Sequence, residues 1–205
     1  MPIDLAELLA PEHTAVVTSE MQRGVIGDLS SIPALGEAAR EAVPQIAALV
    51  DAARAAGAQV IHCTAERRAD NRGANANARL FRAMAKAQNE MHRGSDAWQI
   101  IPEISVAASD IVLSRLHGVS PFAGTDLDPI LRNLGVTTVV ATGVSINVAL
   151  QALTFDLVNS GYQVVLPRDA VAGFPQEYVE MVFANTLGAV ATLPNTADVL
   201  AAWKR

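Results

Sequence analysis

Short apolar runs alternate with longer amphipathic stretches along the chain, and this alternation limits the possible folds more than any other feature. The short runs are rich in Val and are bounded by Gly, Pro or polar residues, which is typical of buried strands. Strands that alternate with helices form βαβ units, whose parallel sheet is covered on both faces. We therefore predict an α/β fold: a single domain over residues 1–205, with three α/β/α layers around a six-stranded, mainly parallel sheet.

The boundaries of these elements follow from the apolar periodicity and from the residues that end helices. Pro44 lies inside the first long helical stretch and predicts a kink or two abutting helices. Gly57, Gly135 and Gly161 each follow a helical stretch and fit its C-terminal end. The predicted strands are 14–21, 58–65, 110–116, 136–143, 162–170 and 189–194. The predicted helices are 34–57, 126–135, 145–161, 175–188 and 196–204.

A ligand site in such a sheet is expected where the strands end. Open α/β sheets bind their ligands in a crevice beyond the carboxyl ends of the strands. The residues that would face this crevice follow directly from the strand assignments. They are the segments 19–28, 62–73, 115–125, 142–149 and 168–175.

Composition narrows the class of protein and of partner. Charged residues make up 18% of the chain, which is below the usual quarter and favours a homo-oligomer with buried interfaces. The net charge of −6 argues against a nucleic-acid partner. No apolar run approaches the roughly 18 residues of a membrane span, and the N-terminus lacks a basic signal-peptide region. Cys63 is the only cysteine, so no internal disulfide forms. These features predict a cytoplasmic protein without a membrane partner.

Basic residues concentrate in one segment, between Glu66 and Arg93. It contains seven of the fifteen Lys and Arg residues and only three acids, which leaves it at +4 and the remainder of the chain at −10. One interpretation is a solvated helix face or a subunit contact. The other is that part of the segment lines a pocket for an anionic substrate, since Arg side chains suit carboxylates.

Four motifs resemble one family. They are "AVVTSEMQRGVIGD" (15–28), "SPFAGTDL" (120–127) and "TGVSINVAL" (142–150), together with "GYQVVLPRDA" (161–170) after the last. In these motifs the chain resembles the isochorismatase-like cysteine hydrolases, a superfamily that includes nicotinamidases, N-carbamoylsarcosine amidases and isochorismatases. The resemblance covers about residues 12–193. It implies a Rossmann-like, six-stranded sheet, an oligomer, and a small-molecule substrate.

The catalytic triad of the amide-hydrolysing members departs from the family pattern at every position. Those members use an Asp, a Lys and a Cys. The positions that match them here hold Glu20, Arg115 and Ala149. Alanine has no nucleophile, so a thioester route through residue 149 is impossible. Cys63 is interpreted as a small buried apolar residue rather than a replacement nucleophile.

The loss of the cysteine does not exclude hydrolysis. Isochorismatases in the superfamily also lack it and hydrolyse a vinyl ether, in which a carboxylic acid protonates the double bond and water attacks. By this resemblance Glu20 is a candidate acid, although it also fits a structural carboxylate paired with Arg115. That pair would favour the ionised carboxylate and so oppose an acid role. His117 is the alternative acid or base.

The turn at residues 143–149 supplies most of the predicted substrate contacts. Backbone N–H groups of Gly143, Val144 and Ser145 are expected to point into the crevice at a helix N-terminus, where an anion or carbonyl oxygen binds. The family often has a non-proline cis peptide in this turn. Asn147 is expected either to contact substrate or to bond the helix start, and Gln22 either to orient Glu20 or to bond nearby backbone. Ala149 and Phe122 complete the predicted substrate-binding set.

Two functions follow from these residues. The first is an isochorismatase-like hydrolase of a small carboxylate-bearing molecule, with Cys-independent acid/base catalysis by Glu20, Arg115 and His117. The second is a catalytically inactive family member that acts as a binding or scaffolding protein. No metal site is expected, because residues 62–73 hold a single His, and no cofactor is expected, since Gly-rich phosphate loops are missing.

Overall fold

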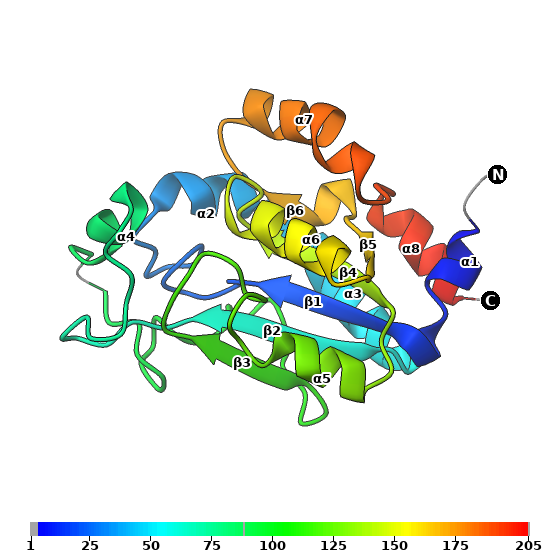
Figure 1. Cartoon of the computed structure of the whole chain (residues 1–205), viewed down its shortest axis with the longest axis horizontal. Helices are drawn as coiled ribbons and strands as arrows, with labels where there is room; N and C mark the ends of the chain where they lie inside the picture. The colour runs from blue at the N-terminus through cyan, green and yellow to red at the C-terminus, as the bar shows by residue number, and fades with distance from the viewer. Residues whose placement is uncertain (1–3, 88, 205) are drawn as a thin grey trace.

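The computed structural model of the chain describes residues 4–87 and 89–204 and has the predicted α/β architecture. Helices cover both faces of a central sheet (Figure 1). The strands run in the order β3-β2-β1-β4-β5, with β6 paired to β4, and every pairing between them is parallel. The strands are β1 (Thr14–Ser19), β2 (Gln59–Ala65), β3 (Ile111–Arg115), β4 (Thr138–Val144), β5 (Gln163–Val165) and β6 (Val171–Ala172).

Two apolar layers form the core, one on each face of the sheet. One layer joins the sheet to α1, α2, α3 and α8, and the other joins it to α5, α6 and α7. Central strands buried on both faces explain the continuous apolar runs of the sequence. The helices are α1 (Leu5–Leu8), α2 (Pro33–Ala39), α3 (Ala42–Ala56), α4 (Arg79–Met84), α5 (Leu127–Asn133), α6 (Ala149–Asn159), α7 (Gln176–Asn185) and α8 (Thr196–Trp203). None of the helices in the described residues has the length and apolar character needed to cross a bilayer.

The predicted break at Pro44 is confirmed as two abutting helices. Pro44 lies in the first turn of α3, where the missing N–H of proline costs no helical hydrogen bond. Gly57 ends α3 with a left-handed φ of 87°, as predicted, because a residue without a Cβ adopts this conformation at little cost.

The sixth strand was predicted wrongly. Residues 189–194 do not form a strand: Thr192 alone bridges to Val165, and its N–H donates to the Val164 carbonyl at 2.9 Å. The sixth strand is instead β6, which follows directly after the predicted fifth strand, 162–170. Pro167 has no N–H to donate to a ladder, and a 3₁₀ turn over Arg168–Ala170 separates β5 from β6.

The helix predicted to start at residue 145 starts at Ala149. The intervening turn is held by the segment after β6, because the Ile146 N–H donates to the Ala172 carbonyl at 2.9 Å. Asn147 bonds the backbone of Phe174 in both directions, at 2.6 and 3.0 Å. These tertiary bonds replace the first helical turn that the sequence pattern indicated.

A buried polar network ties β2 to the start of β3. His62 is fully buried; its Nδ1 lies 2.8 Å from the Thr18 hydroxyl and its Nε2 lies 3.2 Å from Asp110. Arg54 donates two hydrogen bonds to the same Asp110 carboxylate, at 3.0 and 2.6 Å. Desolvation by burial lowers the pKa of His62 below its ordinary value of 6.5, although Asp110 opposes the shift.

This network predicts that the fold loses stability as the pH falls below about 6.5. The unfolded chain then binds a proton at His62 that the folded chain takes up only at lower pH, so protonation favours unfolding. The free energy of unfolding, measured in urea at pH 8 and pH 5.5, should decrease more for the wild type than for His62→Gln. An equal decrease in both proteins would contradict the assignment to His62.

Candidate functional site

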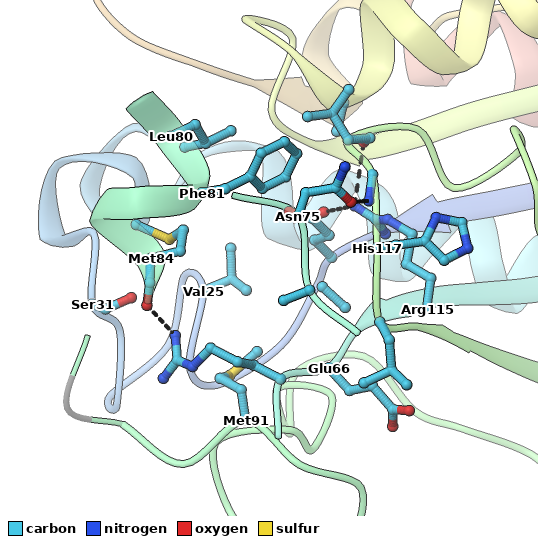
Figure 2. A pocket seen from close by; sticks show the side chains of 18 of the residues that line it. Val25, Ser31, Glu66, Asn75, Leu80, Phe81, Met84, Met91, Arg115 and His117 are labelled. Atoms are coloured by element: carbon cyan, nitrogen blue, oxygen red, sulfur yellow. Dashed lines mark hydrogen bonds and ion pairs between the residues drawn. The ribbon is translucent and has the colours of Figure 1, made fainter. Parts of the chain in front are cut away.

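A cavity of about 210 Å³ lies beyond the carboxyl ends of β1, β2, β3 and β4. Four of the five predicted crevice segments line it, and 168–175 does not. Residues 66–87 and 89–91, which we name the cover segment, contribute its outer wall and include α4. Figure 2 shows Leu80, Phe81 and Met84 on the α4 side of the cavity, with Arg115 and His117 across from them.

Glu20 stands at the end of β1 and lines the cavity. Its N–H donates to the Cys63 carbonyl at 2.8 Å, so the backbone continues the pairing with β2 for one more bond. Its φ is 55°, a left-handed conformation that is uncommon for a residue with a side chain. The Gln22 N–H donates back to the Glu20 carbonyl at 2.8 Å and completes a tight turn. This turn fixes the carboxyl group at the strand end.

Arg115 is the last residue of β3 and is only 7% exposed. Its Nη2 donates to the Glu20 carboxylate and to the Val119 carbonyl, the latter at 3.2 Å. Its Nε and Nη1 are buried and have no hydrogen-bond partner within the described residues. The expected pairing of Glu20 with Arg115 is therefore present, and it leaves the guanidinium with donor capacity to spare.

His117 follows two residues later, in the loop after β3. Its side chain is exposed, and it lines both this cavity and a neighbouring one of about 240 Å³. No hydrogen bond joins His117 to Glu20 or Arg115 in the part of the chain that the structure describes. The three predicted catalytic residues thus share one cavity, but only Glu20 and Arg115 are in direct contact.

The turn after β4 carries Ser145 and Ala149 into the cavity wall. The Val144–Ser145 peptide bond is cis, as the family resemblance led us to expect. Gly143 and Val144, by contrast, belong to β4 rather than to a helix N-terminus, and Val144 is fully buried. Neither Gly143 nor Val144 lines the cavity, which corrects the expectation that their N–H groups face a ligand there. Ser145, Val148 and Ala149 are the residues of this turn that line it.

Gln22 is fully buried and does not line the cavity. Its amide donates to the Ala65 and Trp98 carbonyls, each at 2.9 Å, and accepts from the Ala65 N–H at 2.8 Å. Of its two expected roles, it has the second, which is to bond nearby backbone. Its place in the predicted substrate-binding set was wrong because its amide is fully occupied at the end of β2.

Asn147 and Phe122 also lie outside the cavity lining. The Asn147 amide is occupied by the Phe174 backbone, so it makes neither a substrate contact nor the expected bond at the start of α6. Phe122 is 9% exposed and packs edge-to-face on Tyr162, with ring centroids 6.2 Å apart. Both residues hold the scaffold of the site, which corrects their prediction as substrate contacts.

Cys63 behaves as the predicted buried apolar residue. It is 2% exposed in β2, and burial raises the pKa of its thiol to about 12. A thiol with so high a pKa supplies almost no thiolate at neutral pH, and the thiolate is the nucleophilic form. The one sulfhydryl of the chain therefore has no environment for nucleophilic catalysis.

The cover segment is held in place by Arg67. Its guanidinium donates to the carbonyls of Met84 at 2.6 Å, of Ala87 at 3.1 Å and of Asn89. Burial lowers the pKa of Arg67. Its side chain lines the cavity, but its N–H groups donate to backbone carbonyls. The other six basic side chains between Glu66 and Arg93 are exposed. The interpretation as a solvated face therefore holds for those six, and the segment does not bring free cations to the cavity.

Several residues that line the cavity were not predicted as site residues from the sequence. Glu66 and Asn71 lie within a predicted crevice segment but were not singled out, and Asn75 lies just beyond it. The Asn75 side chain accepts a hydrogen bond from the Gly118 N–H at 2.8 Å, which joins the cover segment to the loop after β3. The apolar spacing of Leu80, Phe81 and Met84 was the available signal for α4. The remaining apolar wall consists of Val25, Ile32, Leu35, Met91, Leu116 and Val148.

The cavity is thus mostly apolar, with a carboxylate and a guanidinium paired in its floor. No group of three or more His, Cys, Asp or Glu side chains that could hold a metal ion occurs among residues 4–87 and 89–204. The arrangement can bind a small molecule with one polar end. It offers a carboxyl group as an acid or base and offers no thiol.

Comparisons with known proteins identify the family to which this chain is similar. The model of the isochorismatase domain matches residues 14–198. An uncharacterized isochorismatase family protein of Bacillus subtilis is 31% identical over 83 residues, which is 40% of this chain and 43% of that protein. The ureidoacrylate amidohydrolase of Agrobacterium fabrum is 26% identical over 212 residues, and the match covers 94% of this chain and 92% of the relative.

Solved structures agree with the sequence comparisons. An isochorismatase family protein from Desulfovibrio vulgaris superposes with a TM-score of 0.81 at 25% identity, covering 94% of this chain and 98% of the other. The matched fold has the six-stranded sheet and flanking helices described above. The match of the family model to nearly the whole chain shows that this protein belongs to the isochorismatase family.

Proposed function

We propose that this protein is a hydrolase of small carboxylate-bearing molecules that works by acid/base catalysis without a protein thiol. The observation that carries the proposal is Arg115, whose Nε and Nη1 are buried without partners beside the Glu20 carboxylate. A buried donor that lacks a partner costs roughly 1–3 kcal/mol. A bound carboxylate offsets that cost, since a guanidinium accommodates two carboxylates in its planar fork.

The cavity supports a small substrate with an apolar body. Its volume of about 210 Å³ is below the range of drug-sized ligand sites. The walls of Leu, Val, Met and Phe side chains contact the apolar part and exclude water around it. Electrostatic attraction between Arg115 and an anionic group is correspondingly stronger than in open solvent.

In the proposed reaction Glu20 acts as the acid on a vinyl ether. Its carboxyl O–H donates a proton to the alkene carbon, which leaves a cation stabilised by the ether oxygen. Water adds to that cation and returns a proton to the Glu20 carboxylate. The resulting hemiacetal breaks its C–O bond and releases an alcohol and a carbonyl compound.

The substrate itself assists the acid role of Glu20. When its carboxylate engages Arg115, the positive charge is shared between two anions and holds the ionised Glu20 less strongly. Ala149 leaves room beside the reacting carbon because its side chain is small. His117, at the edge of the cavity, is the second candidate for proton transfer.

The alternative is a binding or scaffolding protein that has lost catalysis. The direct contact between Glu20 and Arg115 favours it, because a paired carboxylate is a poor acid. In either case we propose a homo-oligomer. Exposed apolar side chains of α6, α7 and the turns before them support it: Val148, Phe155, Phe174, Tyr178 and Met181.

A hydrolysis screen decides between these functions. We expect the wild type to hydrolyse at least one member of a panel of carboxylate-bearing vinyl ethers and amides, ureidoacrylate included. The Cys63→Ser variant should give the same kcat/KM, because a buried thiol with a pKa of about 12 takes no part. Product release is followed by NMR. Saturable binding of panel members without hydrolysis of any would favour the binding protein, and loss of turnover in Cys63→Ser would exclude the thiol-independent route.

A further inference from the structure

A second polar group without a partner in the described part of the chain belongs to Asn71, a residue of the cover segment that lines the cavity. The Oδ1 atom of Asn71 is buried and has no hydrogen-bond partner among the described residues. An amide oxygen in this state is an acceptor without a donor, and it costs about as much as the unsatisfied donors of Arg115.

The backbone of Asn71 is held in a conformation that few side chains tolerate. Its φ is 54°, in the left-handed region, where Asn is favoured over other residues with a Cβ. The Asn71 N–H donates to the Arg68 carbonyl at 3.0 Å, and the Asn71 carbonyl accepts from the Ala74 N–H at 3.2 Å. This turn fixes the position of the amide, and Asn75 fastens the same stretch to the loop after β3.

We infer that Asn71 is a specificity-determining residue that accepts a hydrogen bond from an N–H or O–H group of the ligand. The inference rests on the proposed function for the ligand's carboxylate. It adds that the ligand also carries a hydrogen-bond donor, separated from the carboxylate by a compact apolar body. Arg115 then supplies hydrogen-bond donors at the floor of the cavity, and Asn71 supplies an acceptor from the cover segment. The apolar side chains of α4 line the same cavity.

Two ligands that differ in one donor test this directly. Maleamate carries a carboxylate and an amide NH₂, whereas monomethyl maleate carries the same carboxylate and an ester without a donor. Titration calorimetry of the wild type should give a Kd about tenfold lower for maleamate, which is the typical effect of one net hydrogen bond. NMR of each titrated sample checks that neither compound is hydrolysed during the titration, so that the heats report binding alone.

Variants at Asn71 separate the effect of the side-chain acceptor on ligand affinity from the effect of the backbone conformation. Asn71→Gly suits the positive φ and removes the acceptor, so it should abolish the preference between the two ligands. Asn71→Asp keeps an acceptor oxygen in the same place and should keep the preference, even if its charge weakens both ligands. Asn133→Gly changes an exposed asparagine at the end of α5 that does not line the cavity, and it should leave both affinities at wild-type values.

The outcomes separate this inference from the proposed function. A wild-type preference for maleamate that Asn71→Gly abolishes supports the inference, even if the hydrolysis screen finds no substrate. Equal affinity of the wild type for both ligands, no binding of maleamate, or a preference that survives Asn71→Gly would overturn it. Hydrolysis of donor-free carboxylates as fast as of donor-bearing ones would overturn it while leaving the proposed hydrolase intact.

Discussion

Replacing Arg115 with methionine should lower the free energy of unfolding by roughly 3 kcal/mol and abolish carboxylate binding. The side chain of Arg115 is 6% exposed and that of Glu20 is 18% exposed, so the substitution leaves a carboxylate largely out of water without its cation. Methionine has a similar length and fills the space of the aliphatic stem, so the loss reports on the charge more than on packing.

A double variant separates the effect of the Glu20–Arg115 ion pair from the effect of side-chain packing. Glu20→Gln together with Arg115→Met removes both charges and should bring the free energy of unfolding to within about 1 kcal/mol of the wild type. Urea denaturation of the four proteins gives the coupling between the two residues. Additive losses in the double variant would show that Glu20 and Arg115 do not interact as the geometry indicates.

Substituting Gly143 with alanine should destabilise the protein by roughly 4 kcal/mol, from a positive φ and an overpacked backbone together. The φ of Gly143 is 103°, and a Cβ there would lie 2.8 Å from the Ser19 N atom and closer still to the Ser19 oxygen. Because β1 and β4 meet at this point, neither backbone can move without displacing Glu20 or Ser145. We therefore expect loss of ligand binding as well as of stability.

Gly135 is the matched control for this substitution. It also has a positive φ, of 71°, but a Cβ there would meet no atom within 4 Å. Gly135→Ala should therefore lower the free energy of unfolding only by the cost of the positive φ, about 1–2 kcal/mol. Thermal and urea unfolding of both variants measure the difference. Equal losses would show that the contact with Ser19 is relieved by a small shift of the strands.

Much of the sheet could be predicted because its strands are buried on both faces. Val16, Val17, Val139 and Val140 lie in continuous apolar runs, and such runs indicate central parallel strands with little ambiguity. The run at 189–194 is equally apolar, yet it pairs at Thr192 alone. Residues 190–193 are only half-buried, so an apolar run alone does not decide between strand and loop there, and the choice depends on partners distant in the sequence.

The positions of Glu20, Arg115 and Ala149 could be predicted because the motifs around them match the family pattern, and the structure places all three along one cavity. Three polar or aromatic residues near those ends were assigned to the ligand but serve the scaffold: Gln22, Asn147 and Phe122. Spacing along the chain placed them near the crevice, and the hydrogen bonds that occupy Gln22 and Asn147 come from Ala65, Trp98 and Phe174. Nothing in the local sequence reveals those partners.

The cover segment was the least predictable part of the site. Its basic residues suggested an anion pocket, whereas Arg67 bonds carbonyl groups and the others face solvent. Besides Arg67, the side chains that line the cavity from this segment include Asn71, Asn75, Leu80, Phe81 and Met84. The apolar spacing of Leu80, Phe81 and Met84 is the one signal for α4, and over a six-residue helix it is too short to predict the element with certainty.

The kcat/KM of Glu20→Gln, relative to the wild type, tests the acid/base account most directly. The substrate is the best one found in the hydrolysis screen, and Glu37→Gln, which changes an exposed carboxylate on α2, is the control. If Glu20 transfers the proton, kcat/KM should fall by about 10²–10⁴-fold while the variant remains folded and Glu37→Gln keeps wild-type activity. Turnover by Glu20→Gln at the wild-type rate would contradict the account and remove Glu20 as the acid.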